Sequence, residues 1–271
     1  MNNLTLRIIT ALVGVAIIIG SIFIDPLMFT AVFALISILT HVEFIRTTAH
    51  HTHRNHYISS AFTLVAGLCI LCISHPYLTH FAHDDLYWLL LLLPVLLIIE
   101  LYAQRETPFQ HAGLMLLGLL YIPTVFGLYI YMSLKPEVGE WFALGILFMV
   151  WSNDTFAYFA GRWLGRRKLF ERISPKKTWE GFIGGMVMTV ACGYVMSLFY
   201  PEGPGTAVWM GLGLVVSVAG TYGDLAESML KRSIHIKDSG SLLPGHGGFL
   251  DRFDGFLFAV PAAVCYLELA L

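Results

Sequence analysis

The sequence is poor in charge and in cysteine. Charged side chains make up only 13% of its 271 residues, whereas 57% are hydrophobic, and the formal net charge is −2. A chain without a long basic face lacks what nucleic-acid phosphates require of a partner. The four cysteines all lie within apolar runs, where cysteine packs as a small hydrophobe, so no disulfide framework is expected. We therefore expect membrane lipids and small anions as partners, and no nucleic acid.

The sequence also lacks a second soluble domain, an internal repeat and any low-complexity tract. Its apolar residues come in repeated runs of roughly 17 to 22 residues, the length of a helix that crosses a bilayer. Breakers such as Asp25-Pro26 separate the runs. We predict an all-α, polytopic membrane helix bundle that forms a single integral membrane domain over residues 1–271. About nine transmembrane spans are expected, at residues 6–24, 26–42, 57–75, 86–103, 113–132, 141–160, 181–199, 206–222 and 254–271.

The distribution of Lys and Arg predicts how the bundle is oriented. If the N-terminus lies inside, 15 of the 16 basic residues fall on the inner side and only Lys135 lies outside. Since inner loops carry the excess of Lys and Arg, the prediction is N-in and C-out. Residues 1–140 then supply N-terminal helices, and residues 141–271 form a catalytic half. Its two longest cytoplasmic loops, 161–180 and 223–253, are both charged.

One charged segment, residues 228–254, stands out from the apolar chain; we call it the signature segment. It holds four Lys or Arg, three Asp and four Gly, a combination that suits metal-assisted phosphate chemistry. Around its start, Asp224, Glu227, Ser228 and Lys231 are spaced at i, i+3, i+4 and i+7, so a helix would place them on one face. That face offers a metal ligand beside a phosphate clamp, although a solvated juxtamembrane helix shows the same pattern.

The end of the signature segment combines a glycine-rich turn with two acids. The glycines of Pro244–Gly248 can point several backbone N–H groups at one anion, but hairpins and linkers use the same residues. Asp251 and Asp254 follow where the last span begins. Acids at that position can bind a metal ion or simply cap the helix, and both interpretations remain open.

Two further groups lie outside the signature segment. Asp154 sits about six residues before the end of a predicted span, and an acid at that depth is costly unless it faces a polar cavity, a cation or a hydrogen-bonding helix. Lys176, Lys177 and Thr178 are expected where the next helix begins, so ammonium groups and helix N–H groups could converge on phosphates. Positive-inside anchoring explains the lysines equally well.

Close helix packing is indicated by three glycines, Gly181, Gly184 and Gly185, since no G-x-x-x-x-G-K-[ST] motif is present.

Read as one pattern, S-x-L-K-R-x4-K-D-x-G-x2-L-P-x-H-G-G-F-x-D-R-F-D in residues 228–254 resembles the signature of phosphatidate cytidylyltransferases, also called CDP-diacylglycerol synthases. Residues 152–154 (Ser-Asn-Asp) and 174–181 (Ser-Pro-Lys-Lys-Thr-Trp-Glu-Gly) resemble companion elements of that family in the same order. The resemblance covers residues 150–271. It implies transfer of CMP from CTP to phosphatidate, which gives CDP-diacylglycerol and pyrophosphate for phospholipid synthesis. It further implies Mg²⁺, with room for a second cation, in a homodimeric enzyme of the bacterial inner membrane whose active site faces the cytoplasm.

The resemblance and the residues together assign roles as hypotheses. Asp224 and Asp251 are expected to hold the cation or a cation pair, with Asp254, Glu227 and Asp154 as further or outer ligands. The residues expected to act in catalysis are Asp224, Asp251, Lys231, Arg232, Lys237, His246 and Arg252. Those expected to bind substrate are Asp154, Ser174, Lys176, Lys177, Thr178, Ser228, Asp238, Gly247 and Gly248.

Two other functions are compatible with parts of the sequence. A CTP-dependent lipid kinase of the polyprenol or dolichol type would also handle CTP beside a membrane, but it would release CDP. A transporter would account for nine spans and an intramembrane Asp154, although the polar residues gather on one side of the membrane and do not cross it. The D-G-x2-A-R run of CDP-alcohol phosphotransferases is absent.

Overall fold

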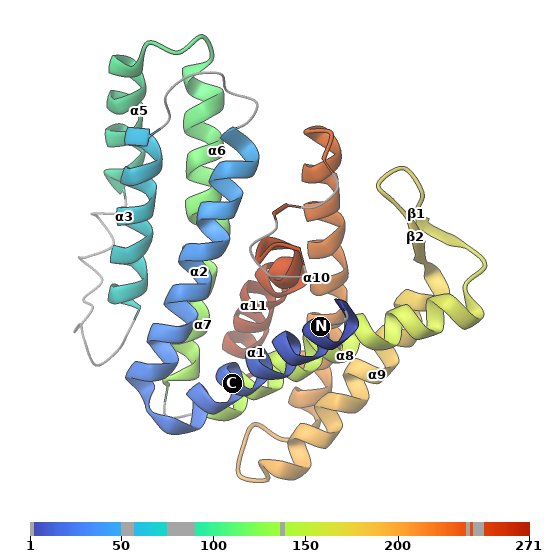
Figure 1. The fold of residues 1–271 in the computed structure, drawn as a ribbon. Helices are drawn as coiled ribbons and strands as arrows, with labels where there is room; N and C mark the ends of the chain where they lie inside the picture. Colours follow the sequence, from blue (N-terminus) through green and yellow to red (C-terminus); the bar gives the residue numbers. More distant parts are fainter. Residues whose placement is uncertain (1–2, 50–56, 75–89, 136–138, 237–238, 241–246) are drawn as a thin grey trace. The chain divides into compact units, whose positions relative to one another are not determined.

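The protein is helical almost throughout in a computed structural model, which describes residues 3–49, 57–74, 90–135, 139–236, 239–240 and 247–271. The chain divides into two compact units (Figure 1). Unit 1 comprises residues 1–134 and 238–250, and unit 2 comprises residues 135–237 and 251–271. The predicted all-α class is confirmed; the described sheet is one short hairpin.

Unit 1 is a bundle of helices, and the start of its second helix follows the predicted breaker Asp25-Pro26. Asp25 caps the helix that begins at Pro26, because its Oδ1 accepts from the backbone N–H of Leu27 at 2.7 Å and of Met28 at 3.2 Å. Proline also opens two later helices, since its missing N–H costs nothing in a first turn. The helices of unit 1 are α1 (Asn3–Ile24), α2 (Pro26–Ala49), α3 (Tyr57–Ile73), α5 (Leu92–Ala103), α6 (Pro108–Tyr121) and α7 (Pro123–Ser133).

An aromatic cluster joins α2 to α7 in unit 1. Phe33 is fully buried, and its ring centroid lies 4.8 Å from that of Phe29, 4.9 Å from Tyr129 and 6.4 Å from Phe126. The ring planes are tilted against one another by 41–54°, which avoids the unfavourable face-to-face sandwich. Between membrane helices such close packing is a main source of stability, because apolar surface gains little by leaving lipid.

Unit 2 carries the long helices and the hairpin. Figure 1 shows α8 and α9 side by side, with the hairpin projecting beyond the end of α8 where α9 begins. In the hairpin, Lys168 pairs with Thr178 and Phe170 with Ser174 in antiparallel register. The predicted loop 161–180 is therefore partly β-structure. The elements of unit 2 are α8 (Gly139–Leu164), β1 (Lys168–Phe170), β2 (Ser174–Thr178), α9 (Trp179–Phe199), α10 (Thr206–Ser233) and α11 (Leu250–Ala270), which starts at the last residue of unit 1.

Glycines allow the helices of unit 2 to approach closely. A side chain at Gly185 would lie 2.9 Å from the backbone oxygen of Asn153, and one at Gly184 would collide with Ala160. A side chain at Gly181 would be equally tight, 2.8 Å from the backbone oxygen of Ala157. The interpretation of these glycines as sites of helix packing is thus confirmed.

The apolar helices overlap all nine predicted spans. The predicted loop 223–253 is shorter than expected, because α10 continues to Ser233 and α11 begins at Leu250. Within the described residues, six helical segments are long and apolar enough to cross a membrane, and three shorter apolar helices accompany them. The six are Pro26–Thr48, Pro108–Ser133, Gly139–Leu164, Trp179–Phe199, Thr206–Ser233 and Leu250–Ala270; the shorter ones are Ile8–Ile24, Ile58–Ile73 and Leu92–Ala103. Several apolar helices indicate an integral membrane protein, whereas the count of nine spans and the N-in, C-out orientation stay predictions.

Candidate functional site

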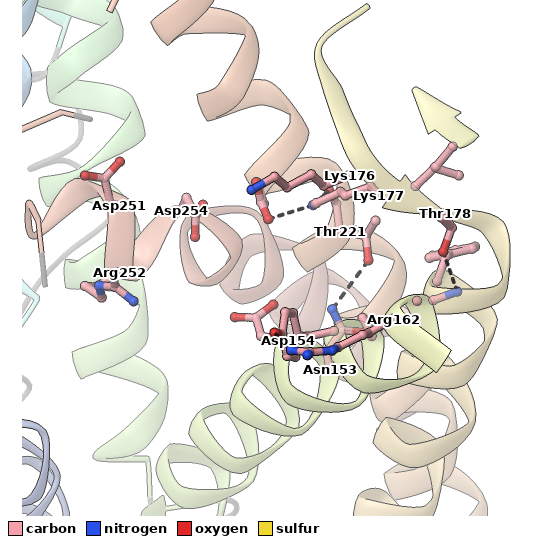
Figure 2. A pocket seen from close by; sticks show the side chains of 17 residues that line it. Asn153, Asp154, Arg162, Lys176, Lys177, Thr178, Thr221, Asp251, Arg252 and Asp254 are labelled. Atoms are coloured by element: carbon pink, nitrogen blue, oxygen red, sulfur yellow. Dashed lines mark hydrogen bonds and ion pairs between the residues drawn. The ribbon is translucent and has the colours of Figure 1, made fainter. Parts of the chain in front are cut away.

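Unit 2 contains a pocket lined by charge, which we call the charged pocket. Its volume is about 530 Å³, within the range of small-molecule sites. Side chains from α8, the hairpin, α9, α10 and α11 line it, and Figure 2 shows those of β2 and α11 around the same space as those of α8. Its charged lining residues are four acids, Asp154, Asp224, Asp251 and Asp254, and four bases, Arg162, Lys176, Lys177 and Arg252. The balance of charge suits a site that holds both a cation and anionic substrates.

Helix α8 contributes one polar face to the pocket. Asp154, Tyr158 and Arg162 follow one another at intervals of four residues, so they lie along the same side of the helix. Arg162 Nη1 donates to Tyr158 Oη at 2.9 Å. The face thus presents a carboxylate toward the middle of the helix and a guanidinium at its end.

Asn153 fixes the position of α8 against α10. Its side chain is buried; Oδ1 accepts from Ser217 Oγ at 2.6 Å, and Nδ2 donates to Thr221 Oγ1 at 3.4 Å. Because buried polar groups are costly without partners, these bonds specify the alignment of the two helices. Asp154 is the neighbour of Asn153, so this alignment determines where its carboxylate enters the pocket.

Lys177 and Asp224 form an ion pair across the pocket. Lys177 lies on β2, and its Nζ is 2.7 Å from Asp224 Oδ2 on α10 and 3.4 Å from the backbone oxygen of Thr221. The two side chains are 24% and 35% exposed, so both remain accessible from the pocket. At the end of β2, Thr178 Oγ1 accepts from Gly181 N–H at 3.2 Å and caps α9, which anchors the hairpin beside the site.

Lys231 joins α10 to α11 through two carboxylates. Its Nζ lies 2.6 Å from Glu227 Oε2 and 2.6 Å from Asp251 Oδ1. Glu227 is buried, and the Lys231 and Asp251 side chains are only 14% and 12% exposed. Such a half-buried bridge is far less screened than a surface pair, so it holds Asp251 at a defined place beside α10.

The acids of the pocket are close enough to repel one another. Asp254 interacts electrostatically with Asp224, Glu227 and Asp154. Carboxylate oxygens are the ligands that Mg²⁺ prefers, so the residue types of the pocket suit such a cation. In the arrangement of the described residues, no three acidic, His or Cys side chains are close enough to form a ligand set.

The structure brings most of the predicted residues together. Asp154, Lys176, Lys177, Thr178, Asp224, Asp251, Arg252 and Asp254 all line the charged pocket. Lys231 forms ion pairs with Glu227 and with the lining residue Asp251. Ser228 Oγ donates to Asp224 Oδ1 at 3.3 Å. The helical spacing predicted for Asp224, Glu227, Ser228 and Lys231 is confirmed, but Glu227 is buried, so this face is not simply solvated.

The remaining predicted residues have other surroundings. Ser174 is half-buried on β2, and Arg232 is exposed in the last turn of α10. Gly247 and Gly248 belong to unit 1, where Gly248 lies against the carboxylate of Glu43. Lys237, Asp238 and His246 lie outside the described residues, so their roles stay predictions.

Two residues that line the pocket, Arg162 and Thr221, are absent from the site predicted from the sequence. The sequence assigns Arg162 only to the positive inner side, yet its spacing from Asp154, two steps of four residues, indicates that both side chains lie on one face of the helix. Thr221 was missed because a single Thr in an apolar helix carries no distinctive pattern; only the contact with Asn153 and the lining of the pocket reveal it.

Comparison with known proteins identifies the family. The family model described as "Cytidylyltransferase family" matches residues 5–270. The chain belongs to the cytidylyltransferase family. A phosphatidate cytidylyltransferase of Bacillus subtilis (strain 168) is 39% identical over 177 residues, 65% of each chain. A protein of the same name from Staphylococcus saprophyticus is 39% identical over 169 residues, 62% of this chain and 63% of the relative. The matches therefore span just under two thirds of these curated relatives.

Proposed function

We propose that this cytidylyltransferase transfers CMP from CTP to phosphatidate and releases pyrophosphate. The observation that supports this most strongly is the charged pocket, which brings four carboxylates and four basic side chains from separate elements to one cavity. Members of the family that share 38–39% identity with the chain are named phosphatidate cytidylyltransferases. Three residues of the signature segment, Asp251, Arg252 and Asp254, line this pocket.

The proposed reaction needs no activated protein nucleophile. An oxygen of the phosphatidate phosphate attacks the α-phosphorus of CTP, a new P–O bond forms, and the bond from that phosphorus to the bridging oxygen breaks, so pyrophosphate leaves with the electron pair. The difficulty is to bring two polyanions together in an attacking geometry. Arg162, Lys176, Lys177 and Arg252 line the cavity where those anions would meet, and their positive charge offsets the repulsion.

The basic residues are assigned different tasks. Lys176, Lys177 and Arg252 face the pocket and are proposed to bind the phosphates of CTP and of the lipid. Lys231 is engaged by Glu227 and Asp251, so we assign it the task of holding Asp251. Arg232, Lys237 and the turn from His246 to Gly248 keep their predicted role in stabilising phosphate charge.

We also propose that Mg²⁺ acts at this site. Asp224 and Asp251 would hold it, with Asp254, Glu227 and Asp154 as further or outer ligands, and a second cation is compatible with five acids. When bound, the cation would neutralise the phosphate oxygens of CTP. From the family resemblance we further propose a homodimer in a bacterial inner membrane, with the charged pocket on the cytoplasmic side.

The test uses purified protein with phosphatidate, Mg²⁺ and CTP labelled in cytidine. The label should enter the lipid phase at a rate that depends on phosphatidate, and chelation of Mg²⁺ should abolish the transfer. The polyprenol or dolichol kinase alternative predicts label released as CDP and none in the lipid. Absence of labelled lipid with correctly folded protein would rule out the proposed reaction.

A further inference from the structure

Glu43, an acid of α2 that the reaction does not use, is buried in the packing of unit 1. Its exposed fraction is 2%, and its Oε2 accepts from the backbone N–H of Leu250 at 2.8 Å, across 207 positions of sequence. One helical turn later, Thr47 Oγ1 donates to the backbone oxygen of Ser239 at 2.7 Å. Helix α2 thus binds the signature segment at two places that flank residues 241–246.

Two glycines of the signature segment make room for the Glu43 carboxylate. A side chain at Gly240 would lie 2.6 Å from Glu43 Cδ and closer still to Oε1, and one at Gly248 would overlap both carboxylate oxygens. Neither glycine is among the described ones with positive φ, so backbone conformation does not demand glycine there. The close approach of Glu43 explains why both positions lack a side chain.

Leu250 is the first residue of α11, so the bond from Glu43 acts on the start of that helix. The first N–H groups of a helix have no partner within it, and a carboxylate there satisfies one of them and interacts favourably with the helix dipole. Asp251 is the next residue, in the first turn of α11, and Asp254 follows three residues later. Whatever fixes the N-terminus of α11 therefore also fixes the carboxylates that this helix supplies to the charged pocket.

We infer that Glu43 is a positioning residue for the reaction: it anchors the start of α11 through Leu250, with Thr47 as a second anchor at Ser239, and so sets the placement of Asp251 and Asp254. This inference rests on the proposed function. Such positioning matters because a misplacement of about 1 Å at a catalytic group can lower the rate on the order of 100-fold.

The first experiment measures CMP transfer by Glu43→Ala and Glu43→Gln in the full-length protein. For Glu43→Ala we expect kcat to fall about 100-fold, with KM for CTP changed by less than about threefold, because geometry is lost and phosphate contacts are kept. Glu43→Gln retains an oxygen acceptor for the Leu250 N–H, so it should recover to within about 10-fold of the wild type. Equal kcat in the wild type and Glu43→Ala would overturn the inference, as would a loss confined to KM.

A matched pair of threonines supplies the control. Thr47→Val removes the hydroxyl that bonds Ser239, whereas Thr48→Val removes a neighbouring hydroxyl that bonds only within its own helix, to the Phe44 oxygen at 2.8 Å and the Ile45 oxygen at 3.2 Å. We expect Thr47→Val to lower kcat about fivefold, the effect of roughly 1 kcal/mol, and Thr48→Val to stay near the wild type. The mild Thr47→Val change keeps the inference testable if Glu43→Ala does not fold, and equal rates for the two threonine variants would contradict it.

A double variant tests whether Gly240 acts through Glu43. Gly240→Ala should displace the carboxylate and lower kcat on its own, but in a Glu43→Ala background the space is already vacant, so the second change should cost little more. Additive losses would refute the proposed contact. If the wild type and Thr48→Val both fail to make labelled lipid, the proposed function is wrong; if both are active and Glu43→Ala matches them, only the positioning role is wrong.

Discussion

Two clusters of charge, one in each unit, differ in how far their acids are accessible to a ligand. In unit 1, Glu100 is 1% exposed and accepts from Ser59 at 2.6 Å, while His111 Nδ1 lies 2.8 Å and Arg105 Nε 2.9 Å from its oxygens. In unit 2, by contrast, Asp224 is 35% exposed and lines a cavity with other acids and bases. In the Glu100 cluster the polar side chains contact one another, and these contacts link α3, α5 and α6. The charged pocket leaves the side chains of Lys177 and Asp224 accessible to a ligand.

The largest expected effect comes from the acids of the charged pocket. Asp224→Asn and Asp251→Asn keep shape and remove charge where a cation and phosphates are proposed to meet. We expect each to lower CMP transfer by about 100- to 1000-fold without loss of membrane insertion. Full activity of either variant would remove that residue from the site.

A smaller loss is expected at Lys177. Replacing it with Met removes the partner of Asp224 and a proposed phosphate contact, so kcat/KM for CTP should fall about 10- to 100-fold. The matched control is Lys135→Met, which removes the ion pair with Glu268 on the exposed surface, where side-chain exposures are 28% and 59%. An exposed pair contributes little, so Lys135→Met should change kcat/KM by less than about twofold. Equal losses in the two variants would show that Lys177 matters only as a surface charge.

The smallest effect on catalysis is expected in the Glu100 cluster, although its effect on stability is large. Arg105→Met leaves Glu100 buried without its bridging guanidinium, and removing one partner of a buried ion pair costs about 3 kcal/mol or more. We expect a lower midpoint of thermal unfolding but an unchanged kcat per folded molecule. A selective loss of kcat with normal stability would show that this cluster also serves the reaction.

The helices were predictable because their limits are local. Asp25 and Pro26 cap and open α2, and apolar runs of bilayer length need no distant information. The hairpin was not predicted, since its three- and five-residue strands are too short and too charged to show a pattern. The acids Asp154 and Asp224 were predicted because charge is scarce in an apolar chain.

What could not be predicted depends on contacts between distant residues. Glu43 carries no local pattern that points to Leu250, and their hydrogen bond spans 207 positions. The burial of Lys231 between Glu227 and Asp251 likewise follows from the packing of α10 on α11. Spacing placed Glu227 and Lys231 on one face but did not show that Asp251 would join them.

The most direct measurement follows both ends of the nucleotide in one reaction. CTP labelled at the α-phosphorus should deliver its label to the lipid, CTP labelled at the γ-phosphorus should release its label as pyrophosphate, and both events should nearly vanish in Asp224→Asn. Transfer of the γ-label to lipid, or undiminished transfer of the α-label by Asp224→Asn, would contradict the assignment of CMP transfer to the charged pocket.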